Sequence, residues 1–472
     1  MRNIRHGYLR QQFQFLRQQY LQDGNLSLEA VLSEELVSEA LNTIEVCWKD
    51  RIYTPLMTLW VFLQQVISAD HSCRAAVARL IVHRVGQGLS ACSSRTGAYC
   101  QARKRLPEEF FATMARGVGK QLEGHAQDEW LWKGHHVYMF DGTTAVMPDT
   151  KENREAYPPT PSSKTGTGMP LARIGAIFSL ACGVALDVAT TKYAGKGTGE
   201  VTLLRQLSAM FSKGDVLLAD CLMCNWRNLY EFQERGIHIV SRLNKALRKA
   251  DFRKGKSLGK DDHLVQWPKP HIREVGRKAQ SAMPRQMTVR EARVFIKQPG
   301  FRTKVIIIVT TLLDPKQYSK EDLADLYRQR WNNELDIRSL KTIMQMECLR
   351  CKTPELIRKE IWTHILAYNL VHTIMAQAAV ENEVLPRTIS FKGTLQVLEA
   401  FQPLISIPTC RSAARRQELH QQILEAVATH RVADRPNRIE PRRLKRRSSP
   451  YPPFTTTRTE TKRQILKGLT KN

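Results

Sequence analysis

Acidic residues are scarce in this sequence, and long apolar runs are missing. The 45 Asp and Glu residues stand against 72 Lys and Arg, which gives a formal charge of +27 at pH 7 and a pI near 9.9. So large a positive excess favours a polyanionic partner, of which nucleic acid is the commonest. The longest apolar runs, 174–189 and 305–313, are interrupted by Gly and Asp or are too short for a bilayer. We therefore predict no membrane partner.

The first residues, MRNIRHGYLRQQFQ, have no apolar stretch of the kind that a secretory signal needs. We therefore expect a cytoplasmic protein. In that compartment the ten cysteines are expected to be reduced thiols. Two Cys-x-x-Cys pairs, at 221/224 and 348/351, lie far apart in the chain, and this separation argues against a zinc ribbon.

The hydrophobic period changes several times along the chain and divides it into six parts. Apolar residues first recur at 3- and 4-residue intervals, then alternate as in strands, and then return to a helical period. The predicted fold class is α/β, with a mixed sheet flanked by helices. The parts are 1–130, an all-α N-terminal domain for DNA binding or assembly; 131–242, the first part of the α/β core; 243–315, a β-rich insertion; 316–382, the second part of the core; 383–430, a helical C-terminal region; and 431–472, a basic, Pro-rich tail.

Two aspartates follow predicted strands. The stretch 135–146 (HHVYMFDGTTAV) predicts a strand that places Asp141 immediately before Gly142, and the buried strand 216–219 leads directly to Asp220. Open α/β sheets carry functional groups at their strand ends. We therefore predict that both carboxylates lie at strand ends of one sheet.

The stretch 327–341 (YRQRWNNELDIRSLK) belongs to a helix predicted over 320–345. At about 100° per residue, its polar side chains form a stripe about 80° wide. This stripe consists of Tyr327, Arg330, Glu334, Arg338 and Lys341. An apolar face beside it, expected to be buried, consists of Leu326, Ile337, Leu340 and Met344. On the pattern alone, a solvated helix with i,i+4 ion pairs is an equally good interpretation.

A second helix, in 360–375 (EIWTHILAYNLVHTIM), is apolar nearly all round and is predicted to be buried. It contains His364 and His372. Neither histidine has further metal-ligating residues at a useful spacing, so we interpret both as core residues.

Other candidate DNA contacts lie beside the polar stripe and near the N-terminus. Trp331 could stack on an unpaired base, although packing under the insertion is the favoured interpretation. The basic helix predicted in 94–106 (SRTGAYCQARKRL) could contact DNA like the second helix of a helix-turn-helix, or could be the charged outer face of a bundle helix. Its candidate contacts are Arg103, Lys104 and Arg105.

The carboxylates Asp141, Asp220 and Glu334 come from separate elements. Three such groups can hold two Mg²⁺ ions, which take hard oxygen ligands. Two ions of this kind activate a water or a 3′-hydroxyl for in-line attack on a phosphodiester, and they stabilise the leaving oxygen. The order strand–Asp, hairpin, helix, strand–Asp, helix–Glu therefore predicts chemistry on a nucleic acid backbone.

With this order of elements, the sequence resembles a DDE transposase of the bacterial cut-and-paste insertion-sequence class. One branch of that class carries the motif Tyr-x2-Arg-x3-Glu-x6-Lys. Tyr327, Arg330, Glu334 and Lys341 match it at every position. The aspartates in FDGT and LLAD match the positions of the two catalytic aspartates, and the resemblance covers about 135–375.

The resemblance implies a ribonuclease-H-like core in which Asp141, Asp220 and Glu334 bind Mg²⁺, with Mn²⁺ as a possible substitute. It implies that the tyrosine, arginine and lysine of the motif hold the DNA backbone near the element end. The implied reaction is hydrolysis at the element ends, followed by attack of the exposed 3′-OH on target DNA. The implied partners are double-stranded DNA at the terminal inverted repeats, target DNA and a second copy of the chain in a dimer, all in the bacterial cytoplasm.

Two other functions fit part of the pattern. A metal-dependent nuclease with the same core would cleave DNA without strand transfer, and the complete motif argues against it. A DNA-binding protein with a degenerate core would do neither, and the presence of all three carboxylates argues against that function.

Overall fold

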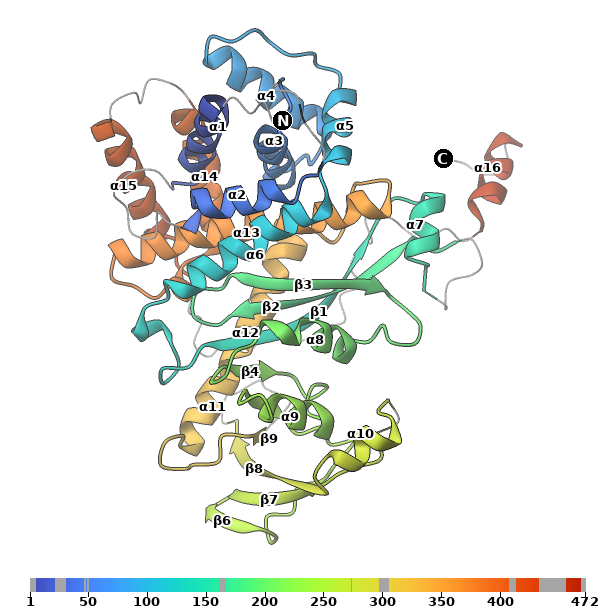
Figure 1. The fold of residues 1–472 in the computed structure, drawn as a ribbon, viewed down its shortest axis with the longest axis vertical. Helices are drawn as coiled ribbons and strands as arrows, with labels where there is room; N and C mark the ends of the chain where they lie inside the picture. The colour runs from blue at the N-terminus through green and yellow to red at the C-terminus, as the bar shows by residue number, and fades with distance from the viewer. Residues whose placement is uncertain are drawn as a thin grey trace.

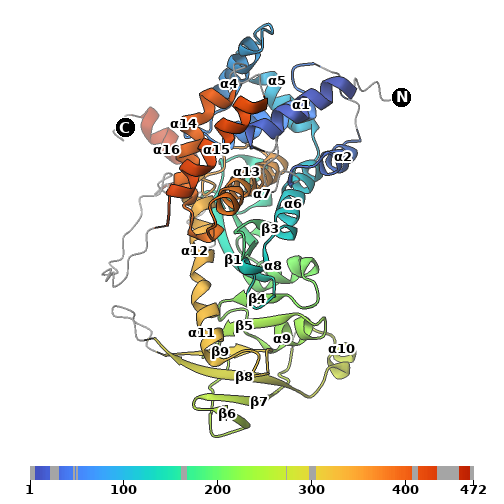
Figure 2. The same cartoon turned by 90° about the vertical axis from the view of Figure 1, so that its left-hand side faces the viewer.

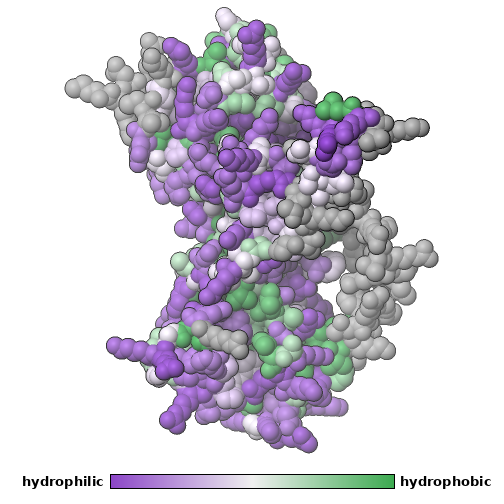
Figure 3. Space-filling view, turned by 90° about the vertical axis from the view of Figure 1, so that its right-hand side faces the viewer, coloured by the Kyte–Doolittle hydropathy of each residue, from purple (hydrophilic) through white to green (hydrophobic). Residues whose placement is uncertain are grey.

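The computed structural model of the protein describes residues 6–21, 31–45, 48, 51–160, 167–272, 274–296, 305–406, 413–432 and 456–467. Figure 1 shows helices gathered at one end of an elongated molecule, and a sheet that runs from its middle to the other end. In Figure 3 a narrower waist joins the two ends, and hydrophilic side chains cover most of that face.

The N-terminal part consists of helices, several of which begin at a hydroxyl cap. Ser33, Thr54 and Ser72 each accept a hydrogen bond from a backbone N–H in the first turn of the helix that follows. The second of these helices, α3, is buried along nearly its whole length and contacts its neighbours on several sides. The helices are α1 (His6–Gln19), α2 (Glu34–Asn42), α3 (Pro55–Ile67), α4 (Cys73–Gly86), α5 (Gly97–Arg105) and α6 (Glu108–Gly124).

The sheet has nine strands in the order β3-β2-β1-β4-β5-β9-β8-β7-β6. β1, β4 and β5 run parallel, and the other neighbouring pairs run antiparallel, so the sheet is mixed as predicted. The strands are β1 (Val137–Val146), β2 (Leu171–Ser179), β3 (Ala185–Lys192), β4 (Val216–Ala219), β5 (His238–Arg242), β6 (Lys256–Gly259), β7 (Asp262–Pro268), β8 (Gln286–Phe295) and β9 (Val305–Thr310).

The strands of the predicted insertion 243–315 continue the core sheet. β9 returns beside β5 and pairs with it from Val240↔Thr310 to Arg242↔Ile308. β8, β7 and β6 then extend the same sheet outward, as Figure 2 shows at its lower end. Four shorter helices connect the strands: α7 (Lys151–Ala156), α8 (Glu200–Leu207), α9 (Trp226–Gln233) and α10 (Arg277–Ala282).

The helix predicted over 320–345 is divided into three parts. α11 (Lys320–Gln329) ends where the Arg330 N–H bonds to the Tyr327 carbonyl, three residues back. α12 (Trp331–Arg338) follows at once and leads into a π-helical turn, η4 (Ser339–Ile343). The prediction of one regular helix was therefore wrong, because a 3-residue and a 5-residue bond interrupt the i,i−4 pattern. The predicted core residues Leu326, Leu340 and Met344 are nevertheless buried.

The C-terminal helices are organised by α13 (Pro354–Glu381), which is buried along most of its length. It lies between the N-terminal helices and the sheet, and it contacts α3, α6, α15 and β3 (Figure 1). His364 and His372 lie in this buried helix, as predicted, and burial lowers the pKa of each to about 4 and about 3. The remaining helices are the short η5 (Pro386–Thr388), α14 (Phe391–Ser406), α15 (Ala413–Thr429) and α16 (Arg458–Leu466).

Most of the predicted basic tail, 433–455 and 468–472, lies outside the described residues. Within the described ranges, no helix combines the length and the apolar character that crossing a membrane would require.

Candidate active site

Asp141 and Asp220 are brought together by the pairing of β1 and β4. The two strands run parallel with Val137 opposite Val216 and Met139 opposite Leu218. Counting two residues further leads to Asp141 on β1 and to Asp220 just after β4, and the charge of Asp220 raises the pKa of Asp141, so the two carboxylates are near each other. Because neighbours in register point to the same face, the two carboxylates belong to one site.

Only Asp220 lies at a strand end. Asp141 is in the middle of β1, because that strand continues along β2 for its full length, with Asp141 opposite Ala176. The prediction of a strand end was wrong for Asp141. It lies instead beyond the stretch of β1 that pairs with β4, so it still occupies the carboxyl edge of the parallel part of the sheet.

The environment of Asp141 opposes its ionisation. Burial raises its pKa to about 6, and the negative charges of Glu200 and Asp220 add to the effect. The backbone N–H of Gly142 donates to Asp141 Oδ1 at 2.7 Å, and this bond acts in the opposite direction together with the charge of Arg330. Two or more carboxylates that raise one another's pKa form a site that favours a cation.

Glu200 is a further carboxylate at this site that the sequence analysis did not identify. It is the first residue of α8, and its pKa is raised by burial. An ideal Cβ on Gly142 would lie 2.6 Å from Glu200 Oε1, so only glycine leaves room for this carboxylate. A glycine inside a strand signals such a close approach, and the glycine of FDGT was the available clue.

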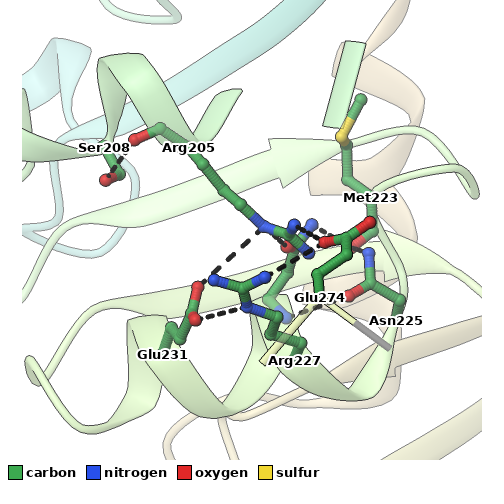
Figure 4. Close-up of polar contacts among 8 residues, drawn as sticks. Arg205, Ser208, Met223, Asn225, Arg227, Glu231 and Glu274 are labelled. Carbon is green, nitrogen blue, oxygen red and sulfur yellow. Dashed lines mark hydrogen bonds and ion pairs between the residues drawn. The ribbon is translucent and has the colours of Figure 1, made fainter. Parts of the chain in front are cut away.

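The helix that carries Glu200 is tied to its neighbours by ion pairs, which Figure 4 shows. Arg205 on α8 reaches Glu274 at 2.5 Å, and Arg227 on α9 reaches the same carboxylate at 3.0 Å. Arg227 also pairs with Glu231 at 2.5 Å. These bonds connect α8 and α9 to the segment that precedes α10.

Glu334, on α12, lies in an ion pair. Its Oε1 is 3.2 Å from Arg330 Nη2, and its side chain is 42% exposed. The charges of Glu334 and Asp141 both raise the pKa of Arg330, against the effect of burial. The Arg330 guanidinium therefore interacts with the helix carboxylate and with the strand carboxylate together.

The other residues of the polar stripe surround this point. Tyr327 is partly buried, and burial raises its pKa although the nearby Arg330 and Arg242 act in the opposite direction. Arg338 is exposed, and Lys341 is partly exposed on the π-helical turn. Electrostatic interactions join Tyr327, Arg330 and Glu334, whereas Arg338 and Lys341 follow further along the interrupted helix.

Trp331 is 51% exposed. The favoured interpretation, packing under the insertion, was therefore wrong. Trp331 is the first residue of α12, directly after the break in the helix.

Arg103 is 4% exposed and is not available to DNA. Its guanidinium lies over the rings of Tyr99 and Phe62, at 4.5 and 4.7 Å from their centroids, and donates to Gln65 Oε1 at 3.4 Å. The prediction that Arg103 contacts DNA is corrected, because cation–π packing and buried polar partners hold the side chain inside.

Lys104 and Arg105 remain exposed at the end of α5. The three adjacent basic residues thus divide into one core residue and two surface residues. The short helix turns its buried side toward Gln65 and α3, and its other side toward solvent.

The donor set suits a hard cation. The side chains of Asp141, Asp220 and Glu334 offer carboxylate oxygens, which Mg²⁺ and Mn²⁺ prefer as ligands. Within the part of the chain that the structure describes, no three His, Cys, Asp or Glu side chains are already gathered as a metal cluster. Asp141 and Asp220 are close enough to interact electrostatically, whereas Glu334 forms an ion pair with Arg330.

Carboxylates on two neighbouring parallel strands and on a later helix, in a strongly basic chain, define a class of metal-dependent enzymes that act on nucleic acid phosphodiesters. Comparison with known families gives the particular member of this class. Residues 132–370, half of the chain, match the family described as Transposase DDE domain, and the chain belongs to this family. The predicted DDE transposase is thereby confirmed.

Proteins similar to this chain are also named as transposases of insertion sequence elements. The chain is 27% identical over 435 residues to the transposase InsG for insertion sequence element IS4 of Escherichia coli K12, which covers 90% of this chain and 93% of that protein. It is 38% identical over 69 residues to the transposase for insertion sequence element IS421 of Escherichia coli, which covers 15% of this chain and 19% of that protein. A putative transposase InsL for element IS186A matches over the same length.

Proposed function

We propose that this transposase cleaves DNA at the ends of its element and joins the 3′-OH to target DNA, with Asp141, Asp220 and Glu334 as metal ligands. The pairing of β1 with β4 supports the proposal, because Asp141 and Asp220 follow it closely enough for the charge of Asp220 to raise the pKa of Asp141, and because α12 packs on β1. When bound, two Mg²⁺ or Mn²⁺ ions would supply an activated water or 3′-hydroxyl and would stabilise the leaving oxygen. The strand order β3-β2-β1-β4-β5 supports a ribonuclease-H-like core.

Arg330 has two functions in this proposal. In the protein alone it neutralises Glu334 and the neighbouring Asp141. On DNA its planar guanidinium exchanges carboxylate oxygens for phosphate oxygens, which have the same bidentate geometry. Glu334 is then released toward the two aspartates.

The DNA backbone near the cut is held by the remaining stripe residues. Arg338 and Lys341 are accessible and supply positive charge, and Tyr327 supplies a hydroxyl close to Arg330. The exposed indole of Trp331 stacks on an unpaired base beside the cut. Lys104 and Arg105 add phosphate contacts from the N-terminal part.

The substrates in this proposal are the terminal inverted repeats of an insertion sequence and a target duplex in the bacterial cytoplasm. The names of the similar proteins support this choice, because each refers to an insertion sequence element. Two copies of the chain assemble on the paired ends, and the +27 charge supports extended contact with DNA beyond the cut itself.

The test uses the purified full chain, a labelled element end, a target plasmid and Mg²⁺. We expect nicking at the element–flank junction and joined products with the wild-type protein, and a loss of at least about 10³-fold in both with Glu334→Gln. DNA affinity should change little, because the metal-binding carboxylate is replaced by an isosteric amide. Equal nicking by Glu334→Gln would refute the assignment of the ligands, and hydrolysis without joined products would favour the nuclease.

A further inference from the structure

The helix that carries Glu334 is not positioned by an apolar stripe. The residues of α12 that are fully buried are both polar, namely Asn333 and Asp336. Leu335 and Ile337 are only partly buried, and Trp331 is exposed. An ordinary amphipathic helix is fixed by its apolar face, whereas only the partly buried Ile337 of α12 packs against the core, so the buried polar groups must contribute to fixing this helix.

A buried ion pair holds the inner side of this helix. Arg387, in the short helix η5, donates through Nη1 to Asp336 Oδ1 at 2.8 Å and through Nη2 to Asp336 Oδ2 at 2.9 Å. Asp336 is 4% exposed. Two parallel bonds between planar groups fix the distance and also the orientation of the carboxylate.

Two other elements complete the surroundings of the ion pair. The Tyr368 hydroxyl, on α13, lies 2.8 Å from the Gly183 carbonyl and 3.1 Å from Asp336 Oδ1, and shares its proton between them. Gly183 has φ +80°, and an ideal Cβ there would lie 2.5 Å from Arg387 Nη1. The turn between β2 and β3 therefore approaches the guanidinium as closely as only a glycine allows.

Aromatic rings from α13 and α14 pack against one another beside this ion pair. The ring of Tyr368 lies 4.4 Å from that of His372 and 5.2 Å from that of Phe391, measured between centroids. Phe391 begins α14. Side chains or backbone of α12, α13, α14, η5 and the β2–β3 turn thus meet around one carboxylate.

We propose that Asp336, Arg387 and Tyr368 are positioning residues that fix the rotation of α12 and thereby direct Glu334 toward the two aspartates. The inference rests on the proposed ligand role of Glu334. Glu334 precedes Asp336 by two residues, about 200° around a helix, so one side chain faces inward and the other faces the site. Buried ion pairs contribute little net stability compared with apolar packing, and defining one arrangement is their better-supported role.

The test compares two bidentate Arg–Asp pairs whose carboxylates are both buried, with Arg387 17% exposed and Arg290 fully buried. Arg387→Lys keeps the positive charge but loses the planar guanidinium, whose two nitrogens donate to both oxygens of the Asp336 carboxylate. The matched control is Arg290→Lys in the insertion, where Arg290 donates to Asp262 at 2.8 and 2.5 Å and is fully buried. Both variants should lose thermal stability. Only Arg387→Lys should also slow the reaction, because a misplacement of about 1 Å at a catalytic group costs about 10²-fold in rate.

With Arg387→Lys we expect about a 100-fold lower cleavage rate at saturating DNA, unchanged affinity for the element end, and Mn²⁺ affinity reduced toward that of Glu334→Gln. Mn²⁺ affinity is read by electron paramagnetic resonance, well below the unfolding temperature of each variant. Arg290→Lys should keep the wild-type rate and Mn²⁺ affinity. If Arg387→Lys does not fold, Tyr368→Phe removes one hydroxyl and should shift both readings in the same direction.

The outcomes separate two failures. Wild-type Mn²⁺ affinity and cleavage in a folded Arg387→Lys protein would overturn the positioning role alone. Equal shifts in Arg387→Lys and Arg290→Lys would also overturn it, because loss of stability would then explain both. Wild-type Mn²⁺ affinity in Glu334→Gln would refute the proposed function itself, since Glu334 would not be a ligand.

Discussion

The helices α12 and α13 both lie against the sheet, but they are held there by different forces. α13 is 28 residues long, and most of its side chains, apolar and polar, are buried. α12 has eight residues, and its fully buried side chains are an asparagine and an aspartate. The position of α13 is determined many times over, whereas that of α12 depends on a few polar bonds. The helix at the centre of the scaffold and the helix that carries Glu334 are thus positioned by different kinds of contact.

The difference matters because apolar and polar contacts respond differently to change. Apolar packing is non-directional, and its loss is felt mainly as lost stability. A bidentate ion pair is directional, and its loss is felt as a change in geometry even when the protein stays folded. Truncating an apolar side chain of α13 should therefore reduce mainly stability, whereas changing the polar bonds around α12, including the bond from Tyr368, should also reduce activity.

The largest expected effect on stability comes from removing a core side chain of α13. Leu366 is fully buried, so Leu366→Ala should lower the free energy of unfolding by about 3 kcal/mol, through lost burial and the cavity left behind. Ile337→Ala, on the partly buried face of α12, should cost about 1 kcal/mol or less. Urea unfolding followed by circular dichroism measures both. Equal losses would contradict the distinction between the two helices.

Leu366→Ala should also leave the chemistry intact. At a temperature where the variant is folded, the cleavage rate per molecule should stay within about twofold of the wild-type rate, because additivity holds for distant sites. A large loss of rate in the folded variant would mean that the apolar packing of α13, and not only its Tyr368 hydroxyl, takes part in positioning the site.

An effect of similar size on binding, with none on stability, is expected at the exposed end of α12. Trp331→Ala should change the free energy of unfolding by less than about 0.5 kcal/mol, because the indole is 51% exposed. If Trp331 stacks on a base, the variant should lose about 1–3 kcal/mol of affinity for DNA with unpaired bases at the junction. Fluorescence anisotropy with paired and unpaired junctions measures the difference.

Trp331→Phe provides the control for this prediction. A phenyl ring keeps a stacking surface, so the affinity for the unpaired junction should be largely restored. Equal affinities of the wild-type protein, Trp331→Ala and Trp331→Phe for both junctions would remove Trp331 from the proposed DNA contacts.

Much of the site could be predicted because it depends on local pattern. The spacing of Tyr327, Arg330 and Glu334 identifies the motif whether or not the helix is regular. Buried residues such as Leu340 also followed from the helical period. What the period could not predict is the break at Arg330, because a single 3-residue bond in place of a 4-residue bond leaves no trace in the pattern.

Other features depend on residues that are distant in sequence. Arg103 and Lys104 are adjacent basic residues, and the tertiary partners Gln65 and Phe62 decide that Arg103 is buried. Glu200 lies 2.6 Å from the position of a Cβ on Gly142 because β1 and α8 meet in three dimensions. Neither fact can be read from composition, charge or period within a short window.

The smallest expected effect concerns the carboxylate on the strand. Because burial and neighbouring charges raise the pKa of Asp141 from 3.8 to about 6, its ionised form destabilises the folded protein in the absence of metal. Asp141 ionises at a lower pH in the unfolded chain than in the folded protein. The loss of stability therefore develops as the pH rises from about 4 to about 6, and it is complete above that range. Asp141→Asn should therefore stabilise the protein at pH 8 in EDTA by about 1–2 kcal/mol, and by less at pH 5.

A second aspartate gives the opposite expectation and completes the comparison. Asp149 forms an ion pair with Arg154, so Asp149→Asn should lower the unfolding temperature at pH 8. Adding Mg²⁺ should raise the unfolding temperature of the wild-type protein and of Asp149→Asn, but not that of Asp141→Asn, because a ligand stabilises only the form that binds it. Destabilisation by Asp141→Asn in EDTA would show that favourable bonds to the Asp141 carboxylate, such as the one from the Gly142 N–H, outweigh the cost of its burial.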